Sequence, residues 1–352
     1  MAFPAPDEIS RLLSSLIDSE YTRATAAVVT AIAQPAQDGR LALRLKEFAD
    51  AAALGPVSPN SAVAAALLDE FEKTLRANRA LMDSVSPSLA SNAATAAGEL
   101  TKQTMFAQDA TISAAYRQPD PEAVAALVQY VDSAAWEQEL GTYQTKNLDV
   151  AKNIIIAGFA AGQNPRTTAA RLAESVKNLP RSTAEQIMRS TQLTSLRDAA
   201  VVHQVANADL IAYIVRVAAL DDRTCLACVA LHGKKLAVGE RVNDHRNGRC
   251  VGIAVPKSRA NEPFRQTYVV DGRDVAISSG EEWLRAHKTN WQKTFMGQGN
   301  YNAYAAGAVK LADFVKFYDD PLFGDAIQEA SLKGILGGQA KDYYATNKNN
   351  LS

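Results

Sequence analysis

All three cysteines of this 352-residue chain fall within one window of 26 residues, from Cys225 to Cys250. The spacing is Cys225-x2-Cys228, then sixteen residues, then His245-x4-Cys250. Two thiolates separated by two residues can face one ion because a tight turn brings their sulfurs together, and a second pair from a distant turn completes a tetrahedron. We therefore predict a closed, structural zinc site with four ligands: Cys225, Cys228, His245 and Cys250.

Two other interpretations of the cysteines stay open. Free cysteines are often buried as small apolar residues. A Cys-x-x-Cys pair can also be redox-active, but this requires a helix on a thioredoxin-like fold, which the residues after Cys228 do not suggest. His232 is either a substitute ligand or a support for one. Because an odd number of cysteines argues against a disulfide framework, we expect the chain to stay in a reducing cytoplasm.

Residues 1–140 carry apolar side chains at helical spacing and predict a helical docking domain. One amphipathic helix is expected where Ile9, Leu12 and Leu16 share a face, and another over 62–81. Alanine is abundant, and aromatic residues make up only 7% of the chain, which favours helices packed closely through small side chains. Pro, Gly and Ser residues predict breaks at 34–39, 55–60 and 85–88.

Helical patterns continue after residue 140. The stretch 148–161 predicts a helix that ends at Gly162, and Pro165 suits the first turn of the next helix. Pro180 is expected to break this second helix, because proline removes a main-chain hydrogen bond inside a helix. A long helix is then expected to about residue 207.

The period of the apolar residues changes at Ile211. Residues 211–217 and 251–255 are rich in β-branched side chains and predict strands. Two further strands, 267–270 and 273–277, are expected to form a hairpin, because the intervening Asp-Gly suits the positive φ angles of a two-residue turn.

A capping box at Ser279 and Glu282 predicts the start of a helix, and helix is expected to dominate to about residue 336. The fold class is therefore predicted as α+β and predominantly helical, with a small antiparallel β unit flanked by helices. The β unit carries a Cys/His knuckle, the segment of residues 221–250 that contains the candidate ligands. We expect three segments: a helical docking domain at 1–140, a domain with the knuckle at 141–336, and a polar tail at 337–352.

Composition excludes several classes of protein. The net charge is −1, with 37 Lys and Arg against 38 Asp and Glu, which does not support a strongly basic nucleic-acid binder. The longest apolar stretch, 154–161, is far shorter than the roughly 20 residues of a membrane span. The first eight residues lack the basic start and apolar core of a signal peptide.

We expect no enzymatic activity. The sequence lacks a Gly-rich phosphate loop and a Gly-x-Ser-x-Gly motif. One alternative is a metal-dependent hydrolase or nuclease that uses Asp222, His232 and His245, which would require an open metal position. Another is a nucleic-acid-binding adaptor, since residues 221–265 hold nine Lys and Arg against five acids. The adaptor hypothesis depends on basic residues such as Arg246 and Arg249.

The knuckle carries a resemblance to a known family. Asp221-Asp222-Arg223-Thr224-Cys225-x-x-Cys228, then Leu231-His232-Gly233-Lys234, then His245…Arg249-Cys250, resembles the Mu F-like domain of bacteriophage minor head proteins. The resemblance covers roughly residues 145–315. The family pattern ends in His-Pro-x-Cys-Arg-Cys, whereas this chain has Arg246 and Gly248 in place of the proline and the first cysteine.

This resemblance implies that the protein is a structural component of a virion. The domain predicted at 141–336 would be a Mu F-like head morphogenesis domain, and the chain a minor head protein at the portal vertex or in the capsid interior, assembled in the host cytoplasm. It would aid head assembly, DNA packaging or genome delivery. The implied partners are the portal protein, the major capsid protein or both, with packaged DNA as a further possibility and no membrane.

Overall fold

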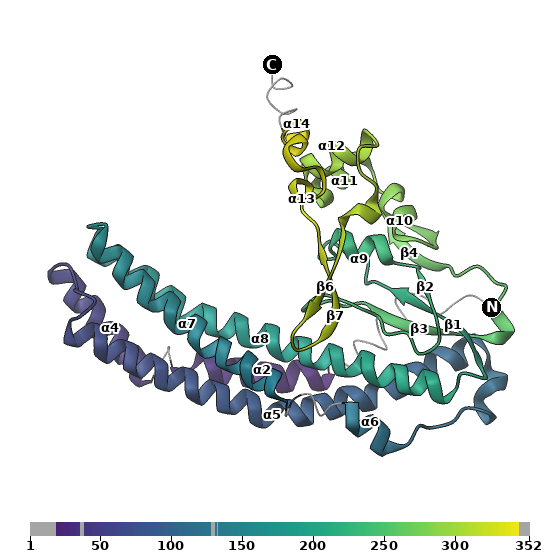
Figure 1. Cartoon of the computed structure of the whole chain (residues 1–352), viewed down its shortest axis with the longest axis horizontal. Coiled ribbons are helices and arrows are strands. Elements are labelled where there is room, and N and C mark those ends of the chain that lie inside the picture. Colours follow the sequence, from purple (N-terminus) through teal and green to yellow (C-terminus); the bar gives the residue numbers. More distant parts are fainter. Residues whose placement is uncertain (1–18, 36–38, 128–130, 132, 345–352) are drawn as a thin grey trace. The chain divides into compact units, whose positions relative to one another are not determined.

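The computed structural model describes residues 19–35, 39–127, 131 and 133–344 (Figure 1). It confirms a predominantly helical α+β fold in which the strands pair antiparallel in small sheets. Among the described residues, no helix combines the length and the apolarity that crossing a bilayer requires. The helix predicted around Ile9 and Leu16 lies outside these residues.

The chain divides into two compact units. The first, called the helical unit, comprises Ile17–Asn92 and Val128–Gln192. The second, called the mixed unit, contains the described residues of Ala93–Leu127 and of 193–344. The division predicted at residue 140 instead falls inside helix α7 (Ala134–Ala160), which belongs to the helical unit.

The helical unit is a bundle with an apolar interior. Its helices are α2 (Ser19–Ala33), α4 (Arg40–Leu54), α7 and the first parts of α5 (Ala62–Gln108) and α8 (Pro165–Ala206). The largest fully buried side chains include Phe48, Phe71, Trp136, Leu140 and Tyr143. The two polar groups among them are paired: Trp136 Nε1 donates to Asp83 Oδ1 at 3.0 Å, and Asn78 Nδ2 donates to Tyr143 Oη at 3.2 Å.

Two of the predicted helix breaks are wrong. Pro87 lies inside α5 and Pro180 inside α8, and both helices continue past their proline. Near the prolines, hydroxyl groups donate to carbonyl oxygens one turn earlier, from Ser86 Oγ to Met82 O at 2.7 Å and from Thr183 Oγ1 to Leu179 O at 2.9 Å. The breaks before α4 and α5 are confirmed, since α2 ends at Ala33 and α4 at Leu54.

A three-stranded sheet lies at the centre of the mixed unit. Strand β1 (Ile211–Val217) pairs antiparallel with both β2 (Lys235–Leu236) and β3 (Val251–Pro256), in the order β2-β1-β3 (Figure 1). Val217 faces Val251 in the register of β1 and β3. The two predicted strands are confirmed, and the segment between them carries the predicted knuckle together with the short helix α9 (Leu226–Leu231).

The predicted hairpin is also confirmed. Strands β4 (Gln266–Val270) and β5 (Arg273–Ile277) pair antiparallel, and the turn residues Asp271 and Gly272 have φ angles of 50° and 76°. Ser279 then caps α10 (Gly280–Ala286), because its side chain accepts from the amide of Glu282.

Helix does not dominate as far as residue 336. After α11 (Thr289–Met296) and α12 (Gln298–Ala305), an unpredicted hairpin follows, formed by β6 (Val315–Asp320) and β7 (Gly324–Glu329). The sequence of β6, VKFYDD, does not alternate regularly between apolar and polar residues, so the pattern did not indicate a strand.

The mixed unit also contains shorter elements. They are α6 (Pro121–Leu127), α13 (Leu332–Leu336), α14 (Ala340–Tyr344) and the 3₁₀ turns at Ala110–Ala114, Lys257–Arg259, Leu311–Phe314 and Gly337–Gln339. The predicted polar tail is therefore structured up to residue 344, where Ala340 is buried. Residues 345–352 lie outside the described part of the chain.

Candidate metal centre

The two thiols of the Cys-x-x-Cys pair are positioned by the start of α9. Cys225 occupies the N-cap position, and its Sγ accepts from the amide of Cys228 at 3.4 Å. On the other side, Glu329 Oε2 of β7 accepts from the amide of Leu226 at 2.8 Å. The capping contacts hold both cysteines on one turn, as the spacing predicted.

Three of the four predicted ligands form one group. One ligand atom from each of Cys225, Cys228 and His245 lies within 4.8 Å of the others, and Cys225 Sγ is 3.4 Å from His245 Nε2. The group is close enough to hold a metal ion. It is reachable from solvent, because the His245 side chain is 29% exposed, whereas Cys228 is buried.

The fourth predicted ligand, Cys250, lies in a second group that shares Cys228 with the first. This group is Cys228, Asp244 and Cys250, all buried, with ligand atoms within 4.8 Å of one another. Cys228 Sγ lies 3.3 Å from Asp244 Oδ1. The four predicted ligands therefore do not form one group, and Cys228 is the residue that the two groups share. Asp244 was not among the predicted ligands.

Asp244 organises the buried half of the cluster. Its carboxylate is fully buried and accepts from Arg197 Nη2 at 2.9 Å and from Arg216 Nη2 at 3.3 Å. It also accepts from the amides of His245 at 3.0 Å and Cys250 at 2.9 Å. Despite burial, the two guanidinium groups hold the pKa of Asp244 below its ordinary value. One carboxylate therefore fixes the backbone of two predicted ligands.

The two arginines come from different elements and have further contacts in the knuckle. Arg197 of α8 donates through Nε to Cys250 O at 3.0 Å and through Nη2 to Gly248 O. Arg216 of β1 donates to Asn243 O and lies 3.8 Å from Cys228 Sγ. Neither carried a sequence signal, because Arg197 stands 47 residues before Asp244 in the chain.

The main chain sets the tautomer of His245. Its Nδ1 lies 2.7 Å from Arg246 O, and a carbonyl oxygen only accepts, so Nδ1 carries a proton. Nε2 is thereby left to face Cys225. A backbone carbonyl that orients an imidazole in this way is the usual second partner of a metal-binding histidine.

The electrostatics favour one negative charge on the cysteine pair and a positive charge beside it. The hydrogen bond from Cys228, aided by His245, lowers the pKa of Cys225 to about 4, whereas bonding to Cys225 and Cys250 and burial raise the pKa of Cys228. Burial opposes protonation of His245, but Cys225 and Asp244 outweigh it and raise the pKa of His245 to about 9. A second thiolate here therefore requires an added cation.

Two bidentate ion pairs fasten the outer turns of the knuckle. Arg249 donates to both oxygens of Asp221 at 2.6 and 2.5 Å, and Arg246 donates to both oxygens of Asp320 in β6 at 2.9 and 3.3 Å. Asp221 also accepts from Thr224 Oγ1 at 3.0 Å. The arginines on which the nucleic-acid adaptor hypothesis depends are thus both paired within the protein.

Asp244 also fills the space next to Gly248. A β-carbon built on Gly248 would lie 2.2 Å from the Asp244 carboxyl carbon and 2.3 and 2.4 Å from its oxygens. A side chain at position 248 and the present position of Asp244 therefore exclude each other.

The residues proposed for an alternative hydrolase do not converge. Asp222 is exposed and belongs to neither metal group, and neither does His232. His232 is buried, and its Nδ1 accepts from the amide of Ala218 at 3.1 Å while its ring contacts Phe264 and Tyr268. It packs against these rings and belongs to neither metal group, so it is not placed as a substitute ligand.

The chain matches no protein-family model, no curated protein and no solved structure. The description of the site therefore depends on the structure alone: Cys and His side chains lie close enough to hold a metal ion, and a buried Asp and two arginines support them.

Proposed function

We propose that the knuckle binds one structural zinc ion through Cys225, Cys228, His245 and Cys250. In a tetrahedral site with Zn–S of about 2.3 Å and Zn–N of about 2.05 Å, a sulfur and a nitrogen ligand stand about 3.5 Å apart. The Cys225 Sγ to His245 Nε2 distance of 3.4 Å fits this arrangement. Cys250 lies in the second group, so its sulfur would have to move towards Cys225 and His245 when the ion binds. A divalent cation also supplies the charge that a second and a third thiolate need.

We further propose that the chain is a minor head protein of a bacteriophage, a structural component of the virion near the portal vertex. One observation carries this proposal: three residues of the head-protein motif, Asp221, Cys225 and Gly233, stabilise the local fold. Asp221 binds Arg249 and Thr224, Cys225 caps α9, and Gly233 leaves room for Ser278 O, 2.1 Å from where its β-carbon would be. Such an arrangement supports a structural rather than an enzymatic role.

The zinc proposal has a direct test. Purified protein should contain about one zinc per chain, and His245→Gln should lower both the zinc content and the melting temperature, because a closed site needs four ligands. His287→Gln is the matched control, since His287 lies outside both metal groups. Protein that contains no zinc and melts unchanged in a chelator would contradict the proposal.

The virion role needs a separate measurement. Mass spectrometry of intact particles should detect the chain in few copies, together with the portal protein and the major capsid protein. Detection only in the lysate of the host, with none in purified particles, would contradict this role and leave the zinc proposal unaffected.

A further inference from the structure

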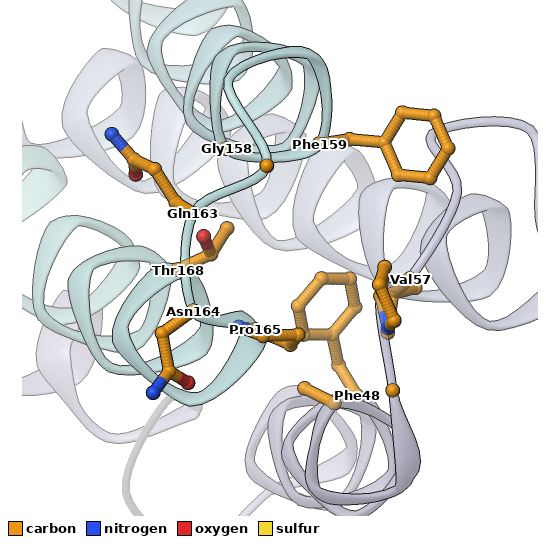
Figure 2. Close-up of a pocket in the computed structure, with 12 residues that line it drawn as sticks. Phe48, Val57, Gly158, Phe159, Gln163, Asn164, Pro165 and Thr168 are labelled. Carbon is orange, nitrogen blue, oxygen red and sulfur yellow. The ribbon is translucent and has the colours of Figure 1, made fainter.

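The two units differ in the reactive side chains that they offer to a reagent in solution. The helical unit has a pocket of about 470 Å³ between the loop after α4 and the turn that joins α7 to α8 (Figure 2). The residues that line it, such as Phe48 and Phe159, include no Cys, His, Asp, Glu, Lys or Arg. The knuckle, in contrast, gathers three cysteines in one small cluster. Of these two places, only the knuckle offers thiol chemistry.

The three thiols of the knuckle differ in their access to solvent. Cys225 is partly exposed, whereas Cys228 and Cys250 are buried, at 2% and 1% exposure. The neighbour of Cys225 on the open side of the cluster is His245, whose side chain is 29% exposed. Because the oxidation of cysteines follows their accessibility, a dissolved oxidant meets Cys225 first.

A second thiol lies within reach of Cys225. The Sγ atoms of Cys225 and Cys228 lie within 4.8 Å of each other, and the capping hydrogen bond from the Cys228 amide holds both residues on one turn. Cys250 belongs to the other group, which shares only Cys228 with the first. An accessible cysteine next to a buried partner is the arrangement in which oxidation ends in a disulfide. A reaction that starts at Cys225 is therefore completed by Cys228.

We propose that Cys225 and Cys228 form a peroxide-sensitive pair, in which Cys225 is oxidised first and Cys228 closes the disulfide. The Cys225 sulfur attacks a hydroperoxide, so that an S–O bond forms, the O–O bond breaks, and the thiol proton leaves with the other oxygen as an alcohol or water. The Cys228 sulfur then attacks the resulting sulfenic acid, so that the S–S bond forms, the S–O bond breaks, and the hydroxyl group takes the Cys228 thiol proton and leaves as water. The two sulfurs together lose two electrons, and the hydroperoxide gains them.

Oxidation of this pair also acts on the proposed zinc site, and in this respect the inference rests on the proposed function. The thiolate is the form of cysteine that binds a metal, and a disulfide sulfur has no such charge. The disulfide therefore removes two of the four proposed ligands, Cys225 and Cys228. Because binding of a structural ion depends on the full ligand set, zinc should leave the protein as the disulfide forms.

Peptide mapping of the full-length protein tests the pairing, because trypsin places Cys225 and Cys228 in one peptide, 224–234, and Cys250 in another, 250–257. The protein is treated with hydrogen peroxide, unfolded, alkylated with iodoacetamide and digested. Peptide 224–234 should lose two hydrogens and carry no alkyl group, whereas 250–257 should carry one, and dithiothreitol should restore alkylation of the first. A disulfide that includes Cys250, or a fully alkylated 224–234, overturns the proposal.

Two matched variants test the order of the steps, since each removes one proposed zinc ligand. In Cys228→Ser, peroxide should produce a sulfenic acid at Cys225 that dimedone captures, because the partner that closes the disulfide is absent. In Cys225→Ser, the buried Cys228 should yield no dimedone adduct. Equal adducts in the two variants would overturn the assignment of Cys225 as the first site. The mapping of the wild-type protein stands even if a variant fails to fold.

The release of zinc is measured on the zinc-loaded protein with a chromophoric chelator. One zinc ion should be released for each disulfide formed, and a disulfide that forms with the zinc retained would overturn the coupling. If the protein never contains zinc, the zinc proposal alone fails, because the mapping of peptide 224–234 in metal-free protein still reports on the cysteine pair.

Discussion

The helical unit and the knuckle of the mixed unit place their charges in opposite ways. In the helical unit, ion pairs such as Lys46–Asp50 and Lys73–Asp69 leave more than half of each side chain exposed, and the interior is apolar. In the knuckle, Asp244 is fully buried between Arg197 and Arg216, which are 5% and 3% exposed. Stability should therefore depend on packed volume in the first region and on charge balance in the second.

The sharpest test of this contrast is the removal of one charge from each region. Asp244→Ala should destabilise the protein by about 3–5 kcal/mol, because it leaves two buried guanidinium groups uncompensated. Asp69→Ala, which removes an exposed helical ion pair, should cost under about 0.5 kcal/mol. Urea denaturation of both variants measures the difference, and equal losses would break the comparison.

Packed volume is tested in the helical unit. Leu140 is completely buried, and Leu140→Ala should cost about 3 kcal/mol through lost burial and a cavity. Leu43→Ala, at an exposed position of the same unit, should change stability by less than about 0.5 kcal/mol. A small loss at Leu140 would show that this bundle tolerates cavities, so that packed volume does not set its stability.

The knuckle region should also respond to pH through His232. Burial lowers the pKa of this imidazole to about 4, so the folded state binds fewer protons than the unfolded state between that value and the ordinary 6.5. Stability is therefore full above pH 6.5 and is lost as the pH falls towards 4, by on the order of 2–3 kcal/mol. His232→Asn, which keeps an acceptor for the Ala218 amide, should flatten the dependence of unfolding free energy on pH in this window.

The smallest expected effect is a gain in the helical unit. Gly141 lies inside α7, and nothing stands within 4 Å of where its β-carbon would be. Gly141→Ala should stabilise the protein by about 0.5–1 kcal/mol, the difference in helix propensity. A rise in the melting temperature checks this, and a fall would reveal a contact of the backbone at this position that alanine disturbs.

The sequence predicted an element well where the residues that determine its conformation all lie within one short segment. The strand 211–217 and the Asp271-Gly272 turn are such cases, because side-chain alternation and positive φ depend on neighbouring residues. The breaks predicted at the prolines were wrong, since Pro87 and Pro180 lie inside helices that continue past them. The hairpin β6–β7 has too little apolar alternation to be detected.

The candidate site was predicted in its ligand types but not in its support. Cys225, Cys228 and His245 lie together as their spacing indicates, whereas Cys250 belongs to a second group with Cys228 and Asp244. Asp244 was missed because one carboxylate in a loop has no periodic signal, and its partners Arg197 and Arg216 come from a helix and a strand elsewhere in the chain. Contacts of this kind depend on tertiary structure, which spacing along a sequence does not encode.

The close contact between Asp244 and Gly248 limits the sequence changes that the knuckle accepts. A cysteine at position 248, where the head-protein pattern has one, would place its β-carbon 2.2 Å from the Asp244 carboxyl carbon. A single mutation therefore cannot convert one form of the motif into the other without moving the aspartate. Positions 244 and 248 should change together among natural variants of this chain, and a designer who wants a fourth cysteine should alter both.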